Sequence, residues 1–141
     1  MPASEQVLVV VRGWVEKAEN DLKNASLTLR AGEECPADTV AFHAQQCAEK
    51  DLKALLTVRG IDFPKTHDIG ELIARIIPAI SVGLSVEDGR RLTAYATITR
   101  YPGNYEPVLV DEARYAVVLA RRVRRDVRRQ LPKGALRRRS R

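Results

Sequence analysis

The sequence predicts an all-α protein, an antiparallel bundle of four long helices and one short helix in a single domain, residues 1–131. Apolar residues recur at three- and four-residue steps through most of the 141 residues, which is the period of an amphipathic helix. No segment shows the alternation of period two that a half-buried strand requires. The connections between the periodic segments are brief, as they are in helical bundles.

The two N-terminal helices carry long apolar stripes. The first is predicted from about residue 11 to a stop at Gly32, and the second from Ala37 to Val58, with Asp38 or Thr39 as its cap. The stripe of the first helix consists of Val11, Trp14, Val15, Ala18, Leu22, Ala25 and Leu29. The stripe of the second consists of Ala41, Ala44, Ala48, Leu52 and Leu55.

Asp51 interrupts the apolar pattern of the second helix, because it lies in phase with Ala44, Ala48 and Leu55. Burying a carboxylate without a partner is costly. We therefore expect Asp51 at the edge of the stripe, in contact with water. The alternative places it in an interior polar network or in a groove.

The next two helices begin at capping signals. Asp68, with Glu71 three residues later, predicts the start of a short helix that Pro78 ends. Ser85 with Asp88 predicts a longer helix in the same way, continuing as far as the arginine of a Thr-Arg-Tyr-Pro-Gly sequence.

The last helix and the C-terminus carry the positive charge of the chain. Asp111 and Glu112 suit the N-terminus of this helix, and Pro132 stops it. Residues 121–141 hold eleven Lys or Arg against one acid, whereas the rest of the chain has a net charge of −4. We expect residues 132–141 to form a disordered basic tail. Such a cluster attracts polyanions without reading their sequence, and a merely solvated, solubilising segment is the alternative.

The two cysteines and two histidines allow one metal-site hypothesis. Cys35, His43, Cys47 and His67 could supply four ligands to zinc, but their spacing is looser than in structural zinc sites. We therefore expect no metal and no cofactor, with His43 packed within its helix and His67 as a structural residue of the turn before Asp68. Reduced cysteines, and the lack of any apolar run near the roughly 18 residues of a membrane span, predict a cytoplasmic protein without a membrane partner.

A resemblance to the HEPN domain family extends over nearly the whole chain, about residues 11–130. It is carried by FHAQQCAEKDLKALLTVRG from Phe42 to Gly60 and by FPKTHDIGELI from Phe63 to Ile73. Trp14, the segment KAENDL that follows it, and the later TRYPG complete the order. The chain departs from the family at Asp51, where a large apolar or aromatic side chain is usual.

The resemblance implies a small helical bundle, prokaryotic and usually a homodimer. Many HEPN proteins are encoded beside a minimal nucleotidyltransferase, as a toxin–antitoxin or stress-response module. Active members are metal-independent ribonucleases whose motif is an arginine, four to six residues, then a histidine, and the two copies of this motif meet across the dimer cleft. Other members are proposed to bind nucleotides or to serve as partner domains.

Carried over to this chain, the motif arginine is Arg100, but positions 105–107 are Tyr105, Glu106 and Pro107. An imidazole, with a pKa of about 6.5, can serve as acid or base at neutral pH, whereas a phenol of pKa about 10 is a poor base. Arg100 could still bind a phosphate bidentately, with Tyr101, Asn104 and Tyr105 contacting the nucleotide or RNA. The alternative is an arginine at a helix end followed by an ordinary Pro-Gly turn.

The sequence thus predicts a partner or toxin-type component of a nucleotidyltransferase module. We expect it to bind nucleotide or RNA in a cleft at Arg100, with weak or absent nuclease activity because the motif histidine is missing. Two alternatives stay open: an active metal-independent endoribonuclease that uses Arg100 and, less plausibly on chemical grounds, Tyr105, or a nucleotide- or RNA-binding module without catalysis.

Overall fold

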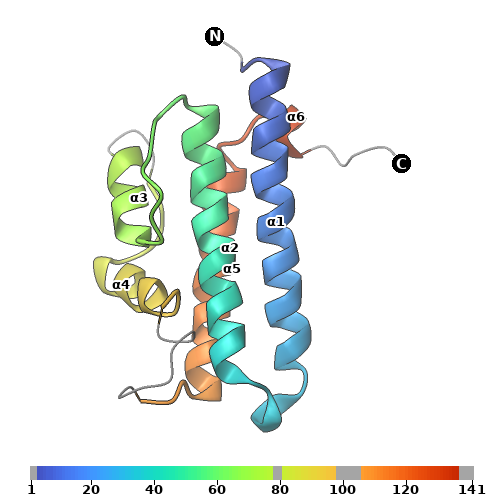
Figure 1. The fold of residues 1–141 in the computed structure, drawn as a ribbon, viewed down its shortest axis with the longest axis vertical. Helices are drawn as coiled ribbons and strands as arrows, with labels where there is room; N and C mark the ends of the chain where they lie inside the picture. Colours follow the sequence, from blue (N-terminus) through green and yellow to red (C-terminus); the bar gives the residue numbers. More distant parts are fainter. Residues whose placement is uncertain (1–2, 78–80, 98–105, 137–141) are drawn as a thin grey trace.

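The computed structural model describes residues 3–77, 81–97 and 106–136, and in these ranges it contains helices and no strand (Figure 1). This confirms the predicted all-α fold class. The elements are α1 (Glu5–Leu29), the 3-10 helix η1 (Gly32–Glu34), α2 (Ala37–Val58), α3 (Ile69–Ile76), α4 (Val86–Ala94), α5 (Val110–Arg128) and α6 (Lys133–Leu136). None of the described helices combines the length and the apolar character needed to cross a membrane.

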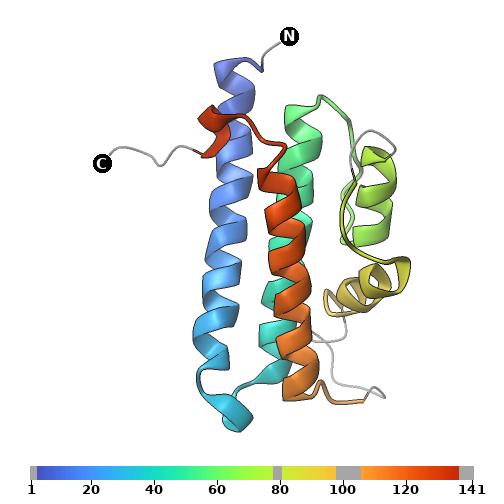
Figure 2. The ribbon, with the colours of Figure 1, turned by 180° about the vertical axis from the view of Figure 1, so that it is seen from behind.

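Helix α2 is the centre of the molecule and packs against α1, α3, α4 and α5. Figures 1 and 2 show that α1 runs antiparallel to both α2 and α5. Helices α2 and α5 run in the same direction, because α3 and α4 return the chain to the end of the bundle at which α2 begins. The predicted antiparallel arrangement therefore holds for α1 against its two neighbours.

Two predicted N-caps are present in the structure. The side chain of Asp68 accepts a hydrogen bond from the backbone N–H of Glu71 at 3.1 Å, and α3 begins at the next residue. The hydroxyl of Ser85 accepts from the N–H of Asp88 at 3.1 Å, and α4 follows. Each cap satisfies one of the N–H groups that the first turn of a helix leaves unpaired.

Helix starts differ from the prediction at two places. Helix α1 begins at residue 5 rather than near residue 11, because the hydroxyl of Ser4 caps it by accepting from Val7 N at 3.2 Å. Helix α2 has the predicted bounds, but Pro36 is its N-cap residue. Asp38 and Thr39, predicted as caps, lie inside its first turn, where Asp38 adds favourable negative charge.

Helix α4 is shorter than predicted, so only three of the described helices are long. It ends at Ala94, and the N–H groups of Tyr95, Ala96 and Thr97 each donate to a carbonyl three residues earlier rather than four. Tyr95 is buried, and its hydroxyl donates to Oε2 of Glu112 at 2.5 Å. This bond joins the end of α4 to the first turn of α5.

The expectation of a disordered tail from residue 132 onward is wrong for residues 133–136, which form α6. The carbonyl of Pro132 accepts a hydrogen bond from the N–H of Ala135 at 2.9 Å, and Ala135 is 1% exposed. Nη1 of Arg12 in α1 donates to the carbonyl of Gly134 at 2.9 Å. The turn is stable because it packs on α1, a contact that no local sequence pattern reveals.

Removing residues 137–141 is expected to leave the fold intact, because α6 and its contacts with α1 are retained. The deletion removes four arginines. The loss of these charges should weaken non-specific association with a polyanion mainly at low salt, and with single-stranded RNA it should lower the slope of log affinity against log salt by up to about 3. Fluorescence anisotropy with labelled oligouridine between 50 and 200 mM salt measures this slope.

A protein shortened to residue 131 is the comparison. It also lacks α6 and should therefore lose thermal stability. Unfolding of the 1–136 protein would contradict the prediction.

Candidate functional site

The sequence-predicted site residues Arg100, Tyr101, Asn104 and Tyr105 lie outside the described residues. The chain on either side of them is described, and the hydrogen bond between Tyr95 and Glu112 joins these two sides. Oε1 of Glu112 also accepts from the backbone N–H of Leu109 at 3.3 Å. Burial and the bond to Glu112 both raise the pKa of Tyr95, so its phenol stays protonated and continues to donate.

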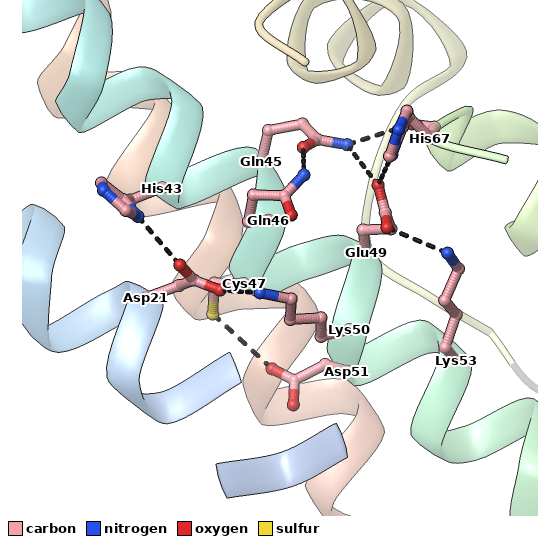
Figure 3. A network of polar contacts seen from close by, with 10 residues as sticks. All are labelled: Asp21, His43, Gln45, Gln46, Cys47, Glu49, Lys50, Asp51, Lys53 and His67. Atoms are coloured by element: carbon pink, nitrogen blue, oxygen red, sulfur yellow. Dashed lines mark hydrogen bonds and ion pairs between the residues drawn. The ribbon is translucent and has the colours of Figure 1, made fainter. Parts of the chain in front are cut away.

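The most polar part of the described interior is a network centred on α2 (Figure 3). It contains ten side chains: Asp21 from α1, His67 from the α2–α3 connection, and from α2 His43, Gln45, Gln46, Cys47, Glu49, Lys50, Asp51 and Lys53. Three carboxylates organise it, and each has a different set of partners.

Asp21 connects α1 to α2. Its Oδ1 is 2.8 Å from Nδ1 of His43, and its Oδ2 accepts from Nζ of Lys50 at 2.6 Å. The His43 side chain is 27% exposed and that of Asp21 12%. His43 is thus held within the bundle, as the sequence predicts, and this arrangement is a cross-link between two helices.

Glu49 is the centre of the second group. Its Oε1 accepts from Nε2 of Gln45 at 3.1 Å and lies 2.8 Å from Nδ1 of His67, while its Oε2 accepts from Nζ of Lys53 at 2.9 Å. Burial acts to raise the pKa of Glu49, but the hydrogen bonds from Gln45, Lys53 and His67 outweigh it and lower that pKa. The carboxylate is therefore ionised at neutral pH despite being 3% exposed.

The ionised carboxylate determines the tautomer of His67. A carboxylate can only accept, so Nδ1 of His67 must carry the proton of their hydrogen bond. In the neutral ring Nε2 is then an acceptor with a free lone pair. The His67 side chain is 48% exposed, and no hydrogen bond from the described residues reaches Nε2. His67 is therefore a half-exposed imidazole with Nδ1 held by Glu49 and Nε2 without a hydrogen-bond partner among the described residues.

Lys53 is held by aromatic rings as well as by Glu49. Its Nζ lies 5.6 Å from the ring centroid of Trp14 and 5.8 Å from that of Phe63. Lys53 is 7% exposed, so these cation–π contacts compensate part of the lost hydration. The two aromatic rings fix the position of the Lys53 ammonium group, and its hydrogen bond in turn fixes the Glu49 carboxylate.

Asp51 is fully buried, so its expected place at the water-exposed edge of the stripe is wrong. Its Oδ2 accepts from Sγ of Cys47 at 3.8 Å, and its Oδ1 has no partner among the described residues. Burial, together with the charge of Glu19, raises the pKa of Asp51 to about 7, although Arg124 and Arg128 act in the opposite direction. Helices α1 and α5 both pack against α2, and their residues Glu19 and Arg124 are close enough to act on the charge of Asp51.

Glu19 of α1 also binds α5. Its two carboxylate oxygens accept from Nε and Nη2 of Arg124 at 2.5 and 3.1 Å, a bidentate pair. Nη1 of Arg128 lies 3.7 Å from the same carboxylate. Two arginines of the basic segment are therefore cross-links between helices rather than free positive charge.

The structure does not bring the four residues considered for zinc together as one set of ligands. His43 and His67 bind different carboxylates, and Cys35 and Cys47 are buried free thiols. Burial and the nearby Asp51 raise the pKa of Cys47, so its thiol stays protonated. Residues 3–77, 81–97 and 106–136 hold no group of three or more potential metal-ligating side chains.

Sequence reasoning missed the Glu49 group, although part of its signal was present. Gln45, Glu49 and Lys53 follow one another at four-residue spacing, which places them on one side of a helix. That spacing cannot show that His67, from a separate connection, completes the group.

Comparisons with known proteins agree with this architecture. The sequence model of the HEPN domain matches residues 11–130. Among solved structures, TT1696 from Thermus thermophilus is 31% identical with a TM-score of 0.73, and the match covers 86% of this chain and 98% of that one. ST0689, described as an archaeal HEPN homologue, is 27% identical with a TM-score of 0.61, covering 85% and 96% of the two chains. No curated protein matches.

Proposed function

The chain belongs to the HEPN domain family, and from this premise we propose that it binds nucleotide or RNA at Arg100 with little or no ribonuclease activity. We place it in a minimal nucleotidyltransferase module, as the partner or toxin-type component. The observation that carries the proposal is the pair of residues at the motif positions: an arginine at 100 and a tyrosine, not a histidine, at 105.

These residue types suit recognition better than proton transfer. The guanidinium of Arg100 can hold a phosphate through two parallel hydrogen bonds and stays charged at any physiological pH. Tyr101 and Tyr105 offer rings on which a base can stack, and Asn104 offers an amide for base or ribose hydroxyls. None of the four is a good base at neutral pH.

The two sides of this segment support a binding role. The Tyr95–Glu112 hydrogen bond joins α4 to α5, and Tyr95 is 2% exposed. A binding loop keeps its geometry best when rigid elements hold both of its ends. This anchoring is the structural support for a ligand site between residues 97 and 106.

We also propose that the protein is a homodimer. Tyr115 and Val118, one turn apart on α5, are exposed by 37% and 48%, and Val86 of α4 by 75%. Contact with a second copy would remove this apolar surface from water. In such a dimer the two Arg100 residues would border one cleft.

The experiment that tests the proposed function is Arg100→Ala. We expect affinity for a labelled nucleotide or a short single-stranded RNA to fall about 10- to 100-fold, the equivalent of one charge-assisted hydrogen-bonding group. Arg90→Ala, at an exposed arginine of α4, is the matched control and should bind normally. Equal binding by the natural protein and the Arg100→Ala variant would contradict the proposal. The segment around Arg100 would then be a helix end and a turn that bind no ligand.

An active ribonuclease is the second candidate. It is favoured by one observation, the exposed imidazole of His67 on the buried carboxylate of Glu49.

A further inference from the structure

His67 has the features of a group that exchanges protons with a ligand. Its Nδ1 is fixed by a carboxylate that is 4% exposed, and the His67 side chain, whose Nε2 has no hydrogen-bond partner among the described residues, is 48% exposed. The carboxylate is itself held by Gln45 and Lys53, and Gln45 additionally donates to the backbone carbonyl of His67 at 3.0 Å. Both the ring and the backbone of this residue are thus oriented by α2 (Figure 3).

We infer that His67 is a general base toward RNA, taking the proton of a ribose 2′-hydroxyl at Nε2, and that Glu49 is its positioning residue. The inference rests on the proposed function to the extent that RNA is the ligand. It also predicts that the chain cleaves RNA slowly, with the imidazole of His67 acting in place of the missing motif histidine.

The reaction is balanced without a metal or a co-reactant. The 2′-oxygen, once deprotonated, attacks the adjacent phosphorus while the bond from phosphorus to the 5′-oxygen breaks. The products are a 2′,3′-cyclic phosphate and a 5′-hydroxyl. The 5′-oxygen takes its proton from water, and the imidazolium of His67 later releases one to water.

A purely structural role explains the arrangement less completely. A residue that only completes the partners of Glu49 needs one donor, and Nδ1 supplies it. It does not need the ring to be half exposed. His43 shows the contrast, because it has the same contact with a carboxylate, also at 2.8 Å, but is 27% exposed and joins two helices.

The position of His67 in the fold places it beside the last turn of α4. The backbone N–H of Ile69, two residues after His67, donates to Oγ1 of Thr93 in the last turn of α4 at 3.0 Å. Lys65, exposed and two residues before His67, adds a positive charge for an approaching phosphate. A strand of RNA crossing from α4 to the α2–α3 connection would meet both Lys65 and His67.

The decisive variant is His67→Asn, because the amide nitrogen of asparagine can replace Nδ1 as the donor to Glu49 while nothing replaces Nε2. We expect the cleavage rate of a single-stranded RNA, measured under single turnover with EDTA, to fall at least about 100-fold. Thermal stability and RNA affinity should be unchanged. His43→Asn is the matched control and should cleave at the natural rate.

Two further measurements separate a catalytic from a structural role. Added imidazole should restore part of the cleavage lost by His67→Ala, which a structural role would not permit. Glu49→Gln should lower the cleavage rate more than it lowers RNA affinity. Cleavage by His67→Asn at the natural rate would overturn the inference, as would the absence of any cyclic-phosphate product from the natural protein between pH 5 and 9. Neither result would affect the proposed function, which depends on loss of binding in Arg100→Ala.

Discussion

An Asp51→Asn protein should be more stable than the natural chain at pH 8, by as much as about 4 kcal/mol, and of similar stability at pH 4. The pKa of Asp51 is raised from 3.8 to about 7 in the folded protein. Each pKa unit corresponds to about 1.4 kcal/mol of differential stability. Asparagine has nearly the same shape and no charge to bury, so it avoids the cost of ionising a side chain that has no exposed surface.

The sign of the pH dependence follows from proton binding. Between about pH 4 and 7 the folded state holds the proton of Asp51 and the unfolded state has lost it. The free energy of unfolding therefore falls as pH rises through this interval and is lowest, for this group, above pH 7. Asp51→Asn should remove that part of the slope. Urea denaturation at pH intervals from 4 to 9 measures it.

Asp21→Asn is the matched control, because Asp21 is also a largely buried carboxylate but has two basic partners, His43 and Lys50. Its replacement leaves a partly buried lysine without its counter-charge and should destabilise the fold at pH 8. Two variants of the same chemistry thus have opposite expected signs. An Asp51→Asn protein that is less stable than the natural chain at pH 8 would show that Asp51 is stabilising in its ionised form.

A Tyr105→His protein should cleave RNA faster than the natural chain, by up to about 100-fold. The change places an imidazole five residues after Arg100, a spacing that active members of the family use. General acid–base catalysis by a well-placed group contributes about 100- to 10,000-fold in rate, and a phenol at neutral pH supplies little of this. Single-turnover cleavage with EDTA, with the RNA fully bound, isolates the chemical step from binding.

Two double variants identify the source of the gain. Arg100→Ala with Tyr105→His should lose it, because the phosphate is no longer held beside the new imidazole. His67→Asn with Tyr105→His should retain most of it, because the new imidazole acts independently of His67. If Tyr105→His binds RNA normally but shows no gain, position 105 does not face the scissile phosphate.

Local sequence patterns were sufficient to predict those features of the structure that depend on residues close together in the chain. The caps Asp68 and Ser85 were predicted because a capping side chain and the N–H that it binds are three residues apart. The bounds of α2 followed from its apolar period. The end of α4 was predicted wrongly, because Tyr95 turns inward to Glu112, a partner 17 residues away.

The candidate site depends more on contacts between distant segments. Asp51 was expected at the water-exposed edge of the stripe because burying a carboxylate without a partner is costly, whereas in the structure, where α1 and α5 both pack against α2, it is fully buried. His67 was expected to be a plain turn residue, since nothing in the sequence around it shows that Glu49, 18 residues earlier, faces it.

The sequence by itself determined the all-helical class, the family, the bounds of α2 and the absence of a histidine at positions 105–107. Periodicity, capping and motif spacing are relations within a few turns of chain, and they can be read from residue order. Only the tertiary structure decided that Asp21 and Glu49 have basic partners, that Asp51 has none in the described part of the chain, and that His67 is the half-exposed imidazole. Those outcomes depend on which helices pack together, because the desolvation and pairing of a charge are set by groups far away in the sequence.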